Sequence, residues 1–422
     1  MKQWVYEIDG NVPLSGEVRV QGSKNAVLPM LAASILQNGC VTLKNCPDIG
    51  DVRCMLGILQ YIGADVKRAG DELYITCSSL NHEEIPADMA CRMRSSVLLM
   101  GALLGRLGSV TVRYPGGCVI GRRPIDLHLE VLKSLGTEIT DVDGIVTGKC
   151  KMLKGSAYTF PKSSVGATEN ALLAAVCAKG ETRLCNCARE PEIHHLCEFL
   201  RQMGGDIREH GSEIVIRGKE RLHGCTFTVP TDRIAAGTYL LAGAATRGDI
   251  ALLEAPIGEM KALLSIYRKM GGQYEVKSGT LLLHSRTIRK PLTRVETAGY
   301  PGFPTDLQSP LLAVLASVNG VSCIEENIFE DRFRAAFQMQ KMGADIRIQG
   351  QSAIIYGGIL TGANVAAEDL RGGAALVIAG LAAHGHTVVS GTEHLERGYV
   401  NLCDYLSMLG GRCAKVQTEE NV

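Results

Sequence analysis

The sequence is short of aromatic side chains, of net charge and of long apolar stretches. Aromatic residues make up 5% of the 422 residues, and Lys plus Arg equals Asp plus Glu at 44 each, so the formal net charge is +0 at pH 7. Overall charge of this kind does not attract nucleic acid or an anionic membrane surface. No uninterrupted apolar run reaches about 18 residues, the length that a membrane-spanning helix needs. We therefore expect neither nucleic acid nor a membrane as a partner.

Several motifs are missing as well. The fifteen cysteines form no C-x-x-C pair, and the chain has neither a P-loop nor a G-x-G-x-x-G fingerprint, so a P-loop ATPase or a Rossmann dehydrogenase is unsupported. The paired histidines lack the spacing of a metal site. Residues 1–16 contain no signal-peptide core, and an odd number of scattered cysteines indicates reduced thiols. These absences predict a cytoplasmic protein without a bound metal.

The chain does contain an internal repeat. A helix-like stretch followed by Gly and a turn into a strand occurs six times, at Gly63, Gly136, Gly204, Gly271, Gly343 and Gly410, with spacings by subtraction of 73, 68, 67, 72 and 67 residues. In step with it, a helix rich in small apolar residues begins near Ser23, Arg94, Gly166, Arg233, Asp306 and Asp369. Each Gly suits the left-handed position after a helix, which residues with a side chain adopt less easily.

Six units of about 70 residues predict an α/β fold with shared cores, because one unit alone cannot bury its apolar faces. Strand-like runs at 110–113, 281–284 and 353–356 fit this pattern. The length suggests two or three domains. If the six apolar helices are placed alike, their N-termini are equivalent positions, and free N–H groups beside Lys and Arg form anion sites. A cleft lined by such helix ends would suit a phosphorylated substrate.

The segment PGGCVIGRRPIDLH, from Pro115 to His128, is the sharpest local signal. Glycines around Cys118 make a loop with little conformational preference, as a lid needs. Arg122 and Arg123 are close enough in sequence to stabilise a thiolate or to bind a phosphate. A surface turn with an incidental cysteine would explain Cys118 alone, but it does not explain the whole segment.

Other charged residues have a structural explanation beside the functional one. Lys24 stands at an expected helix start, where it is mildly unfavourable unless it holds an anion, although an exposed Lys there is usually just solvated. Asp306 is either the N-cap of its helix or a general base for a sugar hydroxyl. Arg332, Arg371 and Arg397 each lie near an acid, which alone indicates a structural ion pair more often than a ligand clamp.

Taken together, these segments resemble one family. GSKNAVLP, PGGCVIGRRPIDLH, GATEN, AREPEI, PGFPTDLQ, DLRGGAALVIAGLAA and ERGY resemble, in this order and over essentially the whole chain, UDP-N-acetylglucosamine 1-carboxyvinyltransferase, the enolpyruvyl transferase of peptidoglycan synthesis and a fosfomycin target. The resemblance implies an inside-out α/β barrel of six βαβαββ-type units in two similar three-unit domains. One domain would comprise residues 1–20 and 231–422 and the other residues 21–230, with the active site in the cleft between them.

The resemblance also implies roles for individual residues. Cys118 would be the general acid toward the phosphoenolpyruvate methylene, able to form a covalent adduct, and Asp306 the base for the 3-hydroxyl, with Lys24 and Arg397 as further catalytic residues. Phosphoenolpyruvate would be held by Lys24, Asn25, Arg123, Arg332 and Arg397. UDP-N-acetylglucosamine would contact Asn25, Arg94, Arg123, Pro124, Ile125, Asp126, Leu127, Lys162, Ser164, Val165, Gly166, Asp306 and Ile328. Asp369 and Arg371 would be charged residues of the cleft.

Enolpyruvyl transfer breaks a C–O bond and not a P–O bond, so we expect no metal or redox cofactor. A thiol with a pKa of about 8.5 or less can donate a proton near neutral pH, and guanidinium groups can replace Mg²⁺ in binding phosphate. Two other interpretations remain. The shikimate-pathway enolpyruvyl transferase shares the architecture but lacks the cysteine loop, and a non-catalytic paralogue would bind UDP-N-acetylglucosamine without turning it over.

Overall fold

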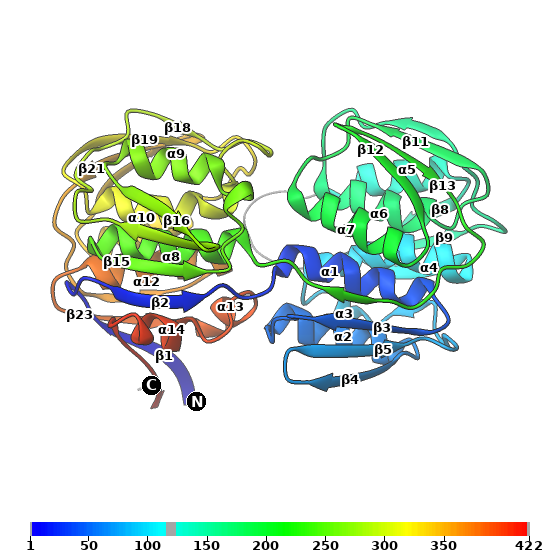
Figure 1. Cartoon of the computed structure of the whole chain (residues 1–422), viewed down its shortest axis with the longest axis horizontal. Coiled ribbons are helices and arrows are strands. Elements are labelled where there is room, and N and C mark those ends of the chain that lie inside the picture. The colour runs from blue at the N-terminus through cyan, green and yellow to red at the C-terminus, as the bar shows by residue number, and fades with distance from the viewer. Residues whose placement is uncertain (1, 115–123, 420–422) are drawn as a thin grey trace. The chain divides into compact units, whose positions relative to one another are not determined.

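A computed structural model of the chain describes residues 2–114 and 124–419 (Figure 1). These residues form two compact units. We call residues 22–114 and 124–230 the middle unit, and residues 2–21 and 231–419 the terminal unit. The chain passes from the terminal unit to the middle unit after Gln21 and returns after Pro230. None of the helices in the described ranges has both the length and the apolar character that spanning a membrane requires.

Each unit contains three four-stranded sheets, and all six sheets share one topology. A short edge strand pairs in parallel with a second strand, which pairs antiparallel with one strand of a β-hairpin or its equivalent. In the middle unit the sheets have the orders β14-β3-β5-β4, β6-β7-β9-β8 and β10-β11-β13-β12. Their strands are β3 (Cys40–Lys44), β4 (Asp65–Ala69), β5 (Glu72–Thr76), β6 (Glu84–Ile85), β7 (Ser109–Arg113), β8 (Glu138–Val142), β9 (Ile145–Lys149), β10 (Ala157–Thr159), β11 (Glu181–Cys185), β12 (Asp206–His210), β13 (Glu213–Arg217) and β14 (Thr226–Thr228).

In the terminal unit the sheets have the orders β16-β17-β15-β2, β18-β19-β21-β20 and β22-β23-β1-β24. Their strands are β1 (Lys2–Asp9), β2 (Ser15–Arg19), β15 (Asp249–Leu253), β16 (Gln273–Lys277), β17 (Thr280–His284), β18 (Val295–Glu296), β19 (Gly320–Glu325), β20 (Asp345–Gln349), β21 (Ser352–Gly357), β22 (Asn364–Ala366), β23 (His386–Ser390) and β24 (Arg412–Glu419). Strand β1 lies between β23 and β24, so this sheet joins segments from opposite ends of the described chain.

The helices alternate with the strands. The middle unit has α1 (Lys24–Ala33), η1 (Ser34–Leu36), α2 (Gly50–Tyr61), α3 (Ala87–Ala90), η2 (Arg94–Leu98), α4 (Leu99–Leu107), α5 (Asp126–Ser134), α6 (Val165–Ala175) and α7 (Pro191–Gln202). The terminal unit has α8 (Arg233–Thr246), η3 (Ile257–Glu259), α9 (Lys261–Lys269), η4 (Thr305–Leu307), α10 (Gln308–Ala316), α11 (Arg334–Lys341), α12 (Leu370–Ala382), α13 (Thr392–Glu396) and α14 (Leu402–Met408).

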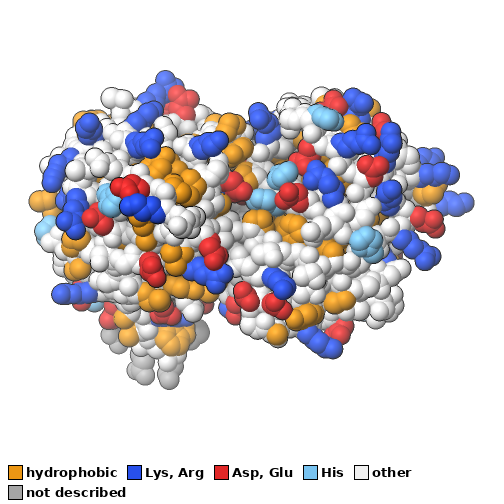
Figure 2. Space-filling view, in the orientation of Figure 1, with side chains coloured by type: hydrophobic (Ala, Val, Ile, Leu, Met, Phe, Trp, Pro, Cys, Tyr) orange, Lys and Arg blue, Asp and Glu red, His pale blue; other side chains and the backbone are white. Residues whose placement is uncertain are grey.

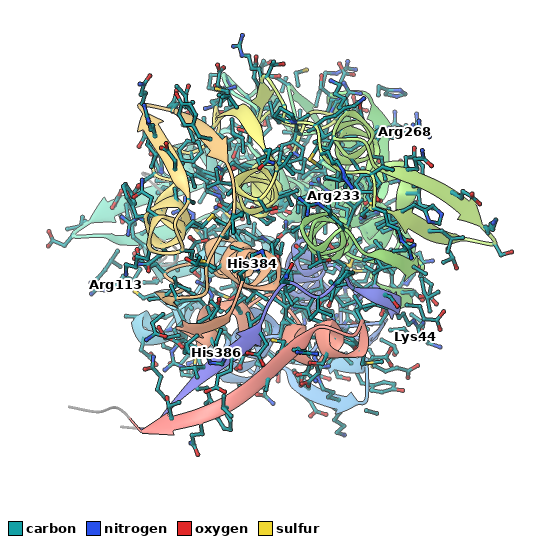
Figure 3. All side chains as sticks on the ribbon, turned by 90° about the vertical axis from the view of Figure 1, so that its left-hand side faces the viewer. Lys44, Arg113, Arg233, Arg268, His384 and His386 are labelled. Atoms are coloured by element: carbon teal, nitrogen blue, oxygen red, sulfur yellow. The ribbon has the colours of Figure 1, made fainter. Side chains whose placement is uncertain are left out.

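The small-residue helices form the centre of each unit. Helices α8, α10 and α12 pack on one another, and nearly all of their residues are buried. Figure 3 shows the terminal unit with its helices nearly end-on and its strands toward the outside. Arg233, the first residue of α8, is 9% exposed, whereas Arg268 of α9 is exposed at the periphery. On the face shown in Figure 2, Lys and Arg side chains are interspersed with Asp and Glu, in line with the zero net charge.

The predicted fold class is confirmed. The six repeated glycines lie where the chain of each repeat turns from a helix into the next strand. Gly63, Gly136, Gly204, Gly271, Gly343 and Gly410 all have positive φ, at 111°, 91°, 96°, 104°, 85° and 81°. Each follows a helix and precedes a strand, as the sequence pattern predicts. A residue with a Cβ is strained in this backbone region, which is why Gly recurs there.

Candidate active site

In the middle unit, Lys24 is the first residue of α1, and its charge meets a buried partner. The Lys24 Nζ atom lies 2.8 Å from Asp51 Oδ2, and the two side chains are 13% and 6% exposed. Ser23 is the N-cap of α1 and accepts a hydrogen bond from the Ala26 N–H. Asp51 lies in the first turn of α2, where the helix dipole favours a carboxylate. The anion that the sequence predicted beside Lys24 is therefore supplied, in part, by the protein itself.

Most of the other described residues that were predicted in the middle unit lie at helix N-termini as well. Arg94 begins η2 and donates from Nη2 to the Pro124 carbonyl at 3.0 Å, which joins two predicted sugar-nucleotide contacts. Ile125 is buried at the start of α5, and Asp126 and Leu127 form its first turn. Asn25 follows Lys24 in α1 and is half-buried.

Helix α6 carries a further group of predicted residues. Ser164 is its N-cap and accepts from the Ala167 N–H, and Val165 and Gly166 form the first turn. A Cβ at Gly166 would lie 3.0 Å from His128 Cε1, so the close approach of α5 explains the glycine. Lys162 is exposed just before this helix.

Asn170 holds these helix starts together. Its Oδ1 accepts from the Gly101 N–H at 2.7 Å, and its Nδ2 donates to the Val97 carbonyl and to His128 Nδ1, both at 2.8 Å. The side chain is fully buried, so these bonds replace all contact with water. Sequence reasoning used Asn170 only as part of the GATEN match and missed this role.

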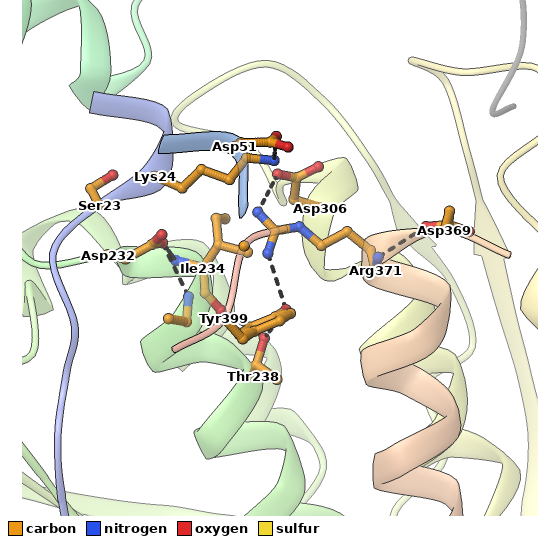
Figure 4. A network of polar contacts seen from close by, with 12 residues as sticks. Ser23, Lys24, Asp51, Asp232, Ile234, Thr238, Asp306, Asp369, Arg371 and Tyr399 are labelled. Carbon is orange, nitrogen blue, oxygen red and sulfur yellow. Dashed lines mark hydrogen bonds and ion pairs between the residues drawn. The ribbon is translucent and has the colours of Figure 1, made fainter. Parts of the chain in front are cut away.

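In the terminal unit, Asp306 is the centre of a polar network (Figure 4). Its Oδ1 lies 2.9 Å from Arg332 Nη2 and its Oδ2 lies 2.9 Å from Arg371 Nη2. The two arginine side chains are 4% and 5% exposed, and that of Asp306 is 26% exposed. Charge-assisted bonds of this kind stabilise the ionised carboxylate.

Asp306 is not the N-cap of its helix. It lies in η4, and the residue that caps α10 is Leu307, with no hydrogen bond from a side chain at that cap. The structure thus gives the N-cap positions of η4 and α10 to Pro304 and Leu307, and the Asp306 carboxylate engages two guanidinium groups. An ionised, partly exposed carboxylate in this position can accept a proton from a hydroxyl group.

Arg371 extends the network into the core. Its Nη1 donates to the Tyr399 hydroxyl at 3.0 Å, and that hydroxyl lies 2.9 Å from Thr238 Oγ1. Burial by itself lowers the pKa of the Arg371 guanidinium, but the negative charges of Asp306 and Asp232 and the hydrogen bond to the Tyr399 hydroxyl outweigh it and raise the pKa above its ordinary value. Arg371 therefore stays charged although it is buried. Tyr399 lies in the ERGY segment, but its role could not be deduced from the sequence.

Asp369 positions Arg371 from the opposite side. It is the N-cap of α12, and its Oδ1 accepts from the N–H groups of Arg371 and Gly372, both at 2.9 Å. This capping fixes the backbone of Arg371 and leaves its side chain to reach Asp306. The predicted cleft residues Asp369 and Arg371 thus belong to one local arrangement.

Arg332 is held mainly by Asp306 and Phe329. Its guanidinium carbon lies 5.5 Å from the centre of the Phe329 ring. The Nε–H group is buried and has no hydrogen-bond partner among the described residues. Buried donors are rarely left unpaired in proteins, and this one is among several such buried polar atoms of the described residues.

The remaining predicted residues have less defined surroundings. Ile328 is 37% exposed on the loop after β19, and Arg397 is the half-buried C-cap of α13. Cys118 and Arg123, with Arg122, lie outside the described residues. Their roles, like the predicted placement of the active site between two domains, stay predictions.

Comparison with known proteins gives consistent results. The sequence profile of the family EPSP synthase (3-phosphoshikimate 1-carboxyvinyltransferase) matches residues 8–406. UDP-N-acetylglucosamine 1-carboxyvinyltransferase 2 of Caldanaerobacter subterraneus is 42% identical over 97% of this chain and 99% of its own length. UDP-N-acetylglucosamine 1-carboxyvinyltransferase of Synechocystis is 40% identical over 98% of this chain and 96% of its own length.

Solved structures agree. The enolpyruvyl transferase NikO from Streptomyces tendae has a TM-score of 0.89 at 26% identity and covers 99% of this chain and 100% of its own. EPSP synthase from Acinetobacter baumannii has a TM-score of 0.74 at 20% identity, with 98% and 100% covered, and shows the fold alone.

The six-sheet fold and the family match define the class: the EPSP synthase family of enolpyruvyl, or carboxyvinyl, transferases. Within that class, the chain belongs to the family of UDP-N-acetylglucosamine 1-carboxyvinyltransferases.

Proposed function

We propose that the chain transfers the enolpyruvyl group of phosphoenolpyruvate to the 3-hydroxyl of UDP-N-acetylglucosamine and releases phosphate, in the cytoplasm, as the first committed step of peptidoglycan precursor synthesis. The observation that carries this proposal is the sequence identity of 40–43%, over nearly the whole chain, with relatives named UDP-N-acetylglucosamine 1-carboxyvinyltransferase. The charged groups at Lys24 and around Asp306 suit two anionic substrates.

The reaction needs a base for the hydroxyl proton. In this proposal the Asp306 carboxylate accepts that proton as the sugar oxygen forms a bond to C2 of phosphoenolpyruvate, while C3 takes up a proton from the Cys118 thiol. Arg332 and Arg371 keep the carboxylate ionised and oriented before it acts. The product of this step is a tetrahedral ketal that still carries the phosphate.

The second step reverses the proton transfer at C3. The C–O bond to phosphate breaks, C3 returns a proton to the Cys118 thiolate, and the C2–C3 double bond returns in the enolpyruvyl group, which is now attached to the sugar oxygen. The proton that Asp306 took from the hydroxyl leaves with the phosphate as hydrogen phosphate, which restores the carboxylate. Charge moves onto the departing phosphate, so cations near it lower the barrier. Lys24, Arg123, Arg332 and Arg397 are the proposed cations.

The test is phosphate release by the purified chain with both substrates, combined with mass spectrometry of the nucleotide product. Each substrate alone serves as the control. Shikimate 3-phosphate in place of the sugar nucleotide tests the rival acceptor. Phosphate release with UDP-N-acetylglucosamine and a product heavier by the enolpyruvyl group are expected. Tight binding of the sugar nucleotide without turnover, or turnover with shikimate 3-phosphate instead, would overturn the proposal.

A further inference from the structure

Glu326 is a buried carboxylate without a role so far, next to the proposed base. It follows β19, is 0% exposed, and makes three contacts through its carboxylate. The Thr305 hydroxyl donates to its Oε2 at 2.9 Å. The N–H groups of Ile328 and Phe329 donate to its Oε1 at 2.8 and 3.1 Å.

These three donors belong to the two segments that present the Asp306–Arg332 pair. Thr305 directly precedes Asp306 in η4. The loop 327–331 leads to Arg332, whose guanidinium lies against the Phe329 ring. One buried carboxylate therefore fixes both the turn that carries Asp306 and the loop that carries its partner Arg332.

The internal repeat shows that Glu326 is a departure from the common design. Strands β3 and β11 are each followed directly by an Asn, whose Nδ2 donates to the carbonyl of the residue after the parallel edge strand. Asn45 donates to the Val229 carbonyl at 2.9 Å, and Asn186 donates to the Phe160 carbonyl at 2.7 Å. After β19 the corresponding Asn is Asn327, which donates to the Thr297 carbonyl at 3.3 Å. It comes one residue later, because Glu326 occupies the intervening place.

The backbone differs at this place as well. The residues that follow β3, β11, β15 and β23 are Asn45, Asn186, Glu254 and Gly391, with positive φ of 54°, 56°, 58° and 72°. Glu326 does not have this left-handed backbone, and neither does Tyr114, which follows β7. Four of the five sister repeats close this turn with a left-handed residue and without a buried carboxylate, which points to a local role for the Glu326 carboxylate beside Asp306 and Arg332.

We propose that Glu326 is a positioning residue for the reaction: it sets the geometry of the Asp306 carboxylate against Arg332 and of Ile328 against the sugar nucleotide. This inference rests on the proposed function. Glu326 itself does not touch substrate; it acts through Thr305 and through the 327–329 backbone.

The experiment compares Glu326→Ala with Glu326→Gln in the full chain, after phosphate release by the unchanged protein has been measured. The Ala variant removes the acceptor for all three donors. We expect kcat to fall about 10- to 100-fold, the cost of a misplaced catalytic group, while the KM for phosphoenolpyruvate moves by less than about threefold. Gln keeps an acceptor oxygen for the two N–H groups and can donate to Thr305, so it should retain kcat within about threefold.

Matched variants separate positioning from general destabilisation. Ser285→Ala removes a buried hydrogen bond to Tyr267, 2.8 Å long, elsewhere in the terminal unit, and should lower the melting temperature without lowering kcat. Glu254→Ala removes the Glu at the equivalent place after β15, where it pairs with Arg19 on the surface, and should leave kcat unchanged. If Glu326→Ala does not fold, Thr305→Val, which removes the hydroxyl link alone, should still lower kcat.

The inference is overturned if Glu326→Ala, or Thr305→Val in its place, turns over like the unchanged protein. It is also overturned if Ser285→Ala loses kcat to the same degree, or if the KM values for both substrates rise with kcat unchanged. Absence of phosphate release by the unchanged protein would instead refute the proposed function, so the two failures are distinguishable.

Discussion

The substitution Asp306→Asn tests the proposed base most directly. Asn has nearly the shape of Asp, but one carboxylate oxygen becomes an NH₂ group that faces a guanidinium. Arg332 and Arg371, 4% and 5% exposed, would then share one neutral acceptor in place of a carboxylate. The variant therefore removes the proton acceptor and also weakens the network around it, and both effects can be given a size.

The loss of stability follows from the two ion pairs. Breaking a fully buried pair costs about 3–5 kcal/mol, and a hydrogen bond to a charged group contributes about 1.5–3 kcal/mol. Asp306 is 26% exposed, so solvent screens part of its interaction. We expect the free energy of unfolding to fall by about 2–4 kcal/mol. Loss of a general base should lower kcat by about 10²- to 10⁴-fold, or about 3–5 kcal/mol in the barrier.

The assay measures three quantities: unfolding in urea, affinity for UDP-N-acetylglucosamine by calorimetry, and kcat from phosphate release. Asp249→Asn is the matched control, because Asp249 also pairs with an arginine, Arg286 at 2.9 Å, and accepts from the Ser285 N–H. That control should lose some stability and keep kcat. If Asp306→Asn folds, binds the sugar nucleotide and turns over near the parent rate, Asp306 is not the base and the reasoning fails.

Three further predictions follow from other charged or reactive groups. Lys24→Ala should raise the KM for phosphoenolpyruvate about 10- to 100-fold and lower kcat. Adding Asp51→Asn to this variant should restore stability, because the neutral side chain at position 51 no longer needs an ammonium partner. The double variant should still bind phosphoenolpyruvate weakly, and recovery of the KM would contradict the role of Lys24. Burial, together with the nearby charges of Glu192 and Glu190, raises the pKa of the Glu169 carboxyl well above 4.5. The folded state therefore keeps a proton that the unfolded chain releases, and the free energy of unfolding falls as pH rises above about 4.5. Glu169→Gln should flatten this slope in urea unfolding measured between about pH 5 and pH 8, and an unchanged slope would refute it. Of the fifteen cysteines, fosfomycin should label Cys118 and thereby abolish activity, whereas Cys118→Asp should stay active and resist the compound. A label found on another cysteine by peptide mapping would contradict this assignment.

Much of the fold could be predicted because its signals are local and repeated. Positive φ at Gly63 or Gly271 is required by a turn that follows a helix directly, and the same requirement recurs in every unit. The small residues of α12 predict a helix buried on most sides, and all but the last residue of that helix are buried. Period and residue type were sufficient for these features, since neither depends on which distant segment packs against them.

The site was predictable only in part, because its geometry depends on contacts between distant residues. Asp306 could be a cap or a base from its sequence context. The structure shows its ion pairs with Arg332 and Arg371, which lie 26 and 65 residues away, and its role as base stays a prediction. Asp51, Tyr399 and Glu326 stand in no motif that assigns them a partner. Their importance arises from burial and from the atoms they reach, which a sequence without a structure does not contain.

The position of β1 between β23 and β24 has a consequence for synthesis on the ribosome. All residues of the middle unit have been translated once residue 230 is reached, whereas β1, translated before them, obtains its second partner only when residues 412–419 appear. At about 5–20 residues per second, the ribosome takes about 10–40 s to translate the stretch between residue 230 and the end of β24. During that time the residues of β1 hold unpaired N–H and C=O groups and apolar side chains, Val5, Tyr6 and Ile8 among them, that the finished fold buries. Vectorial synthesis thus favours completion of the middle unit before the terminal unit, and leaves the first strand as the last to be enclosed.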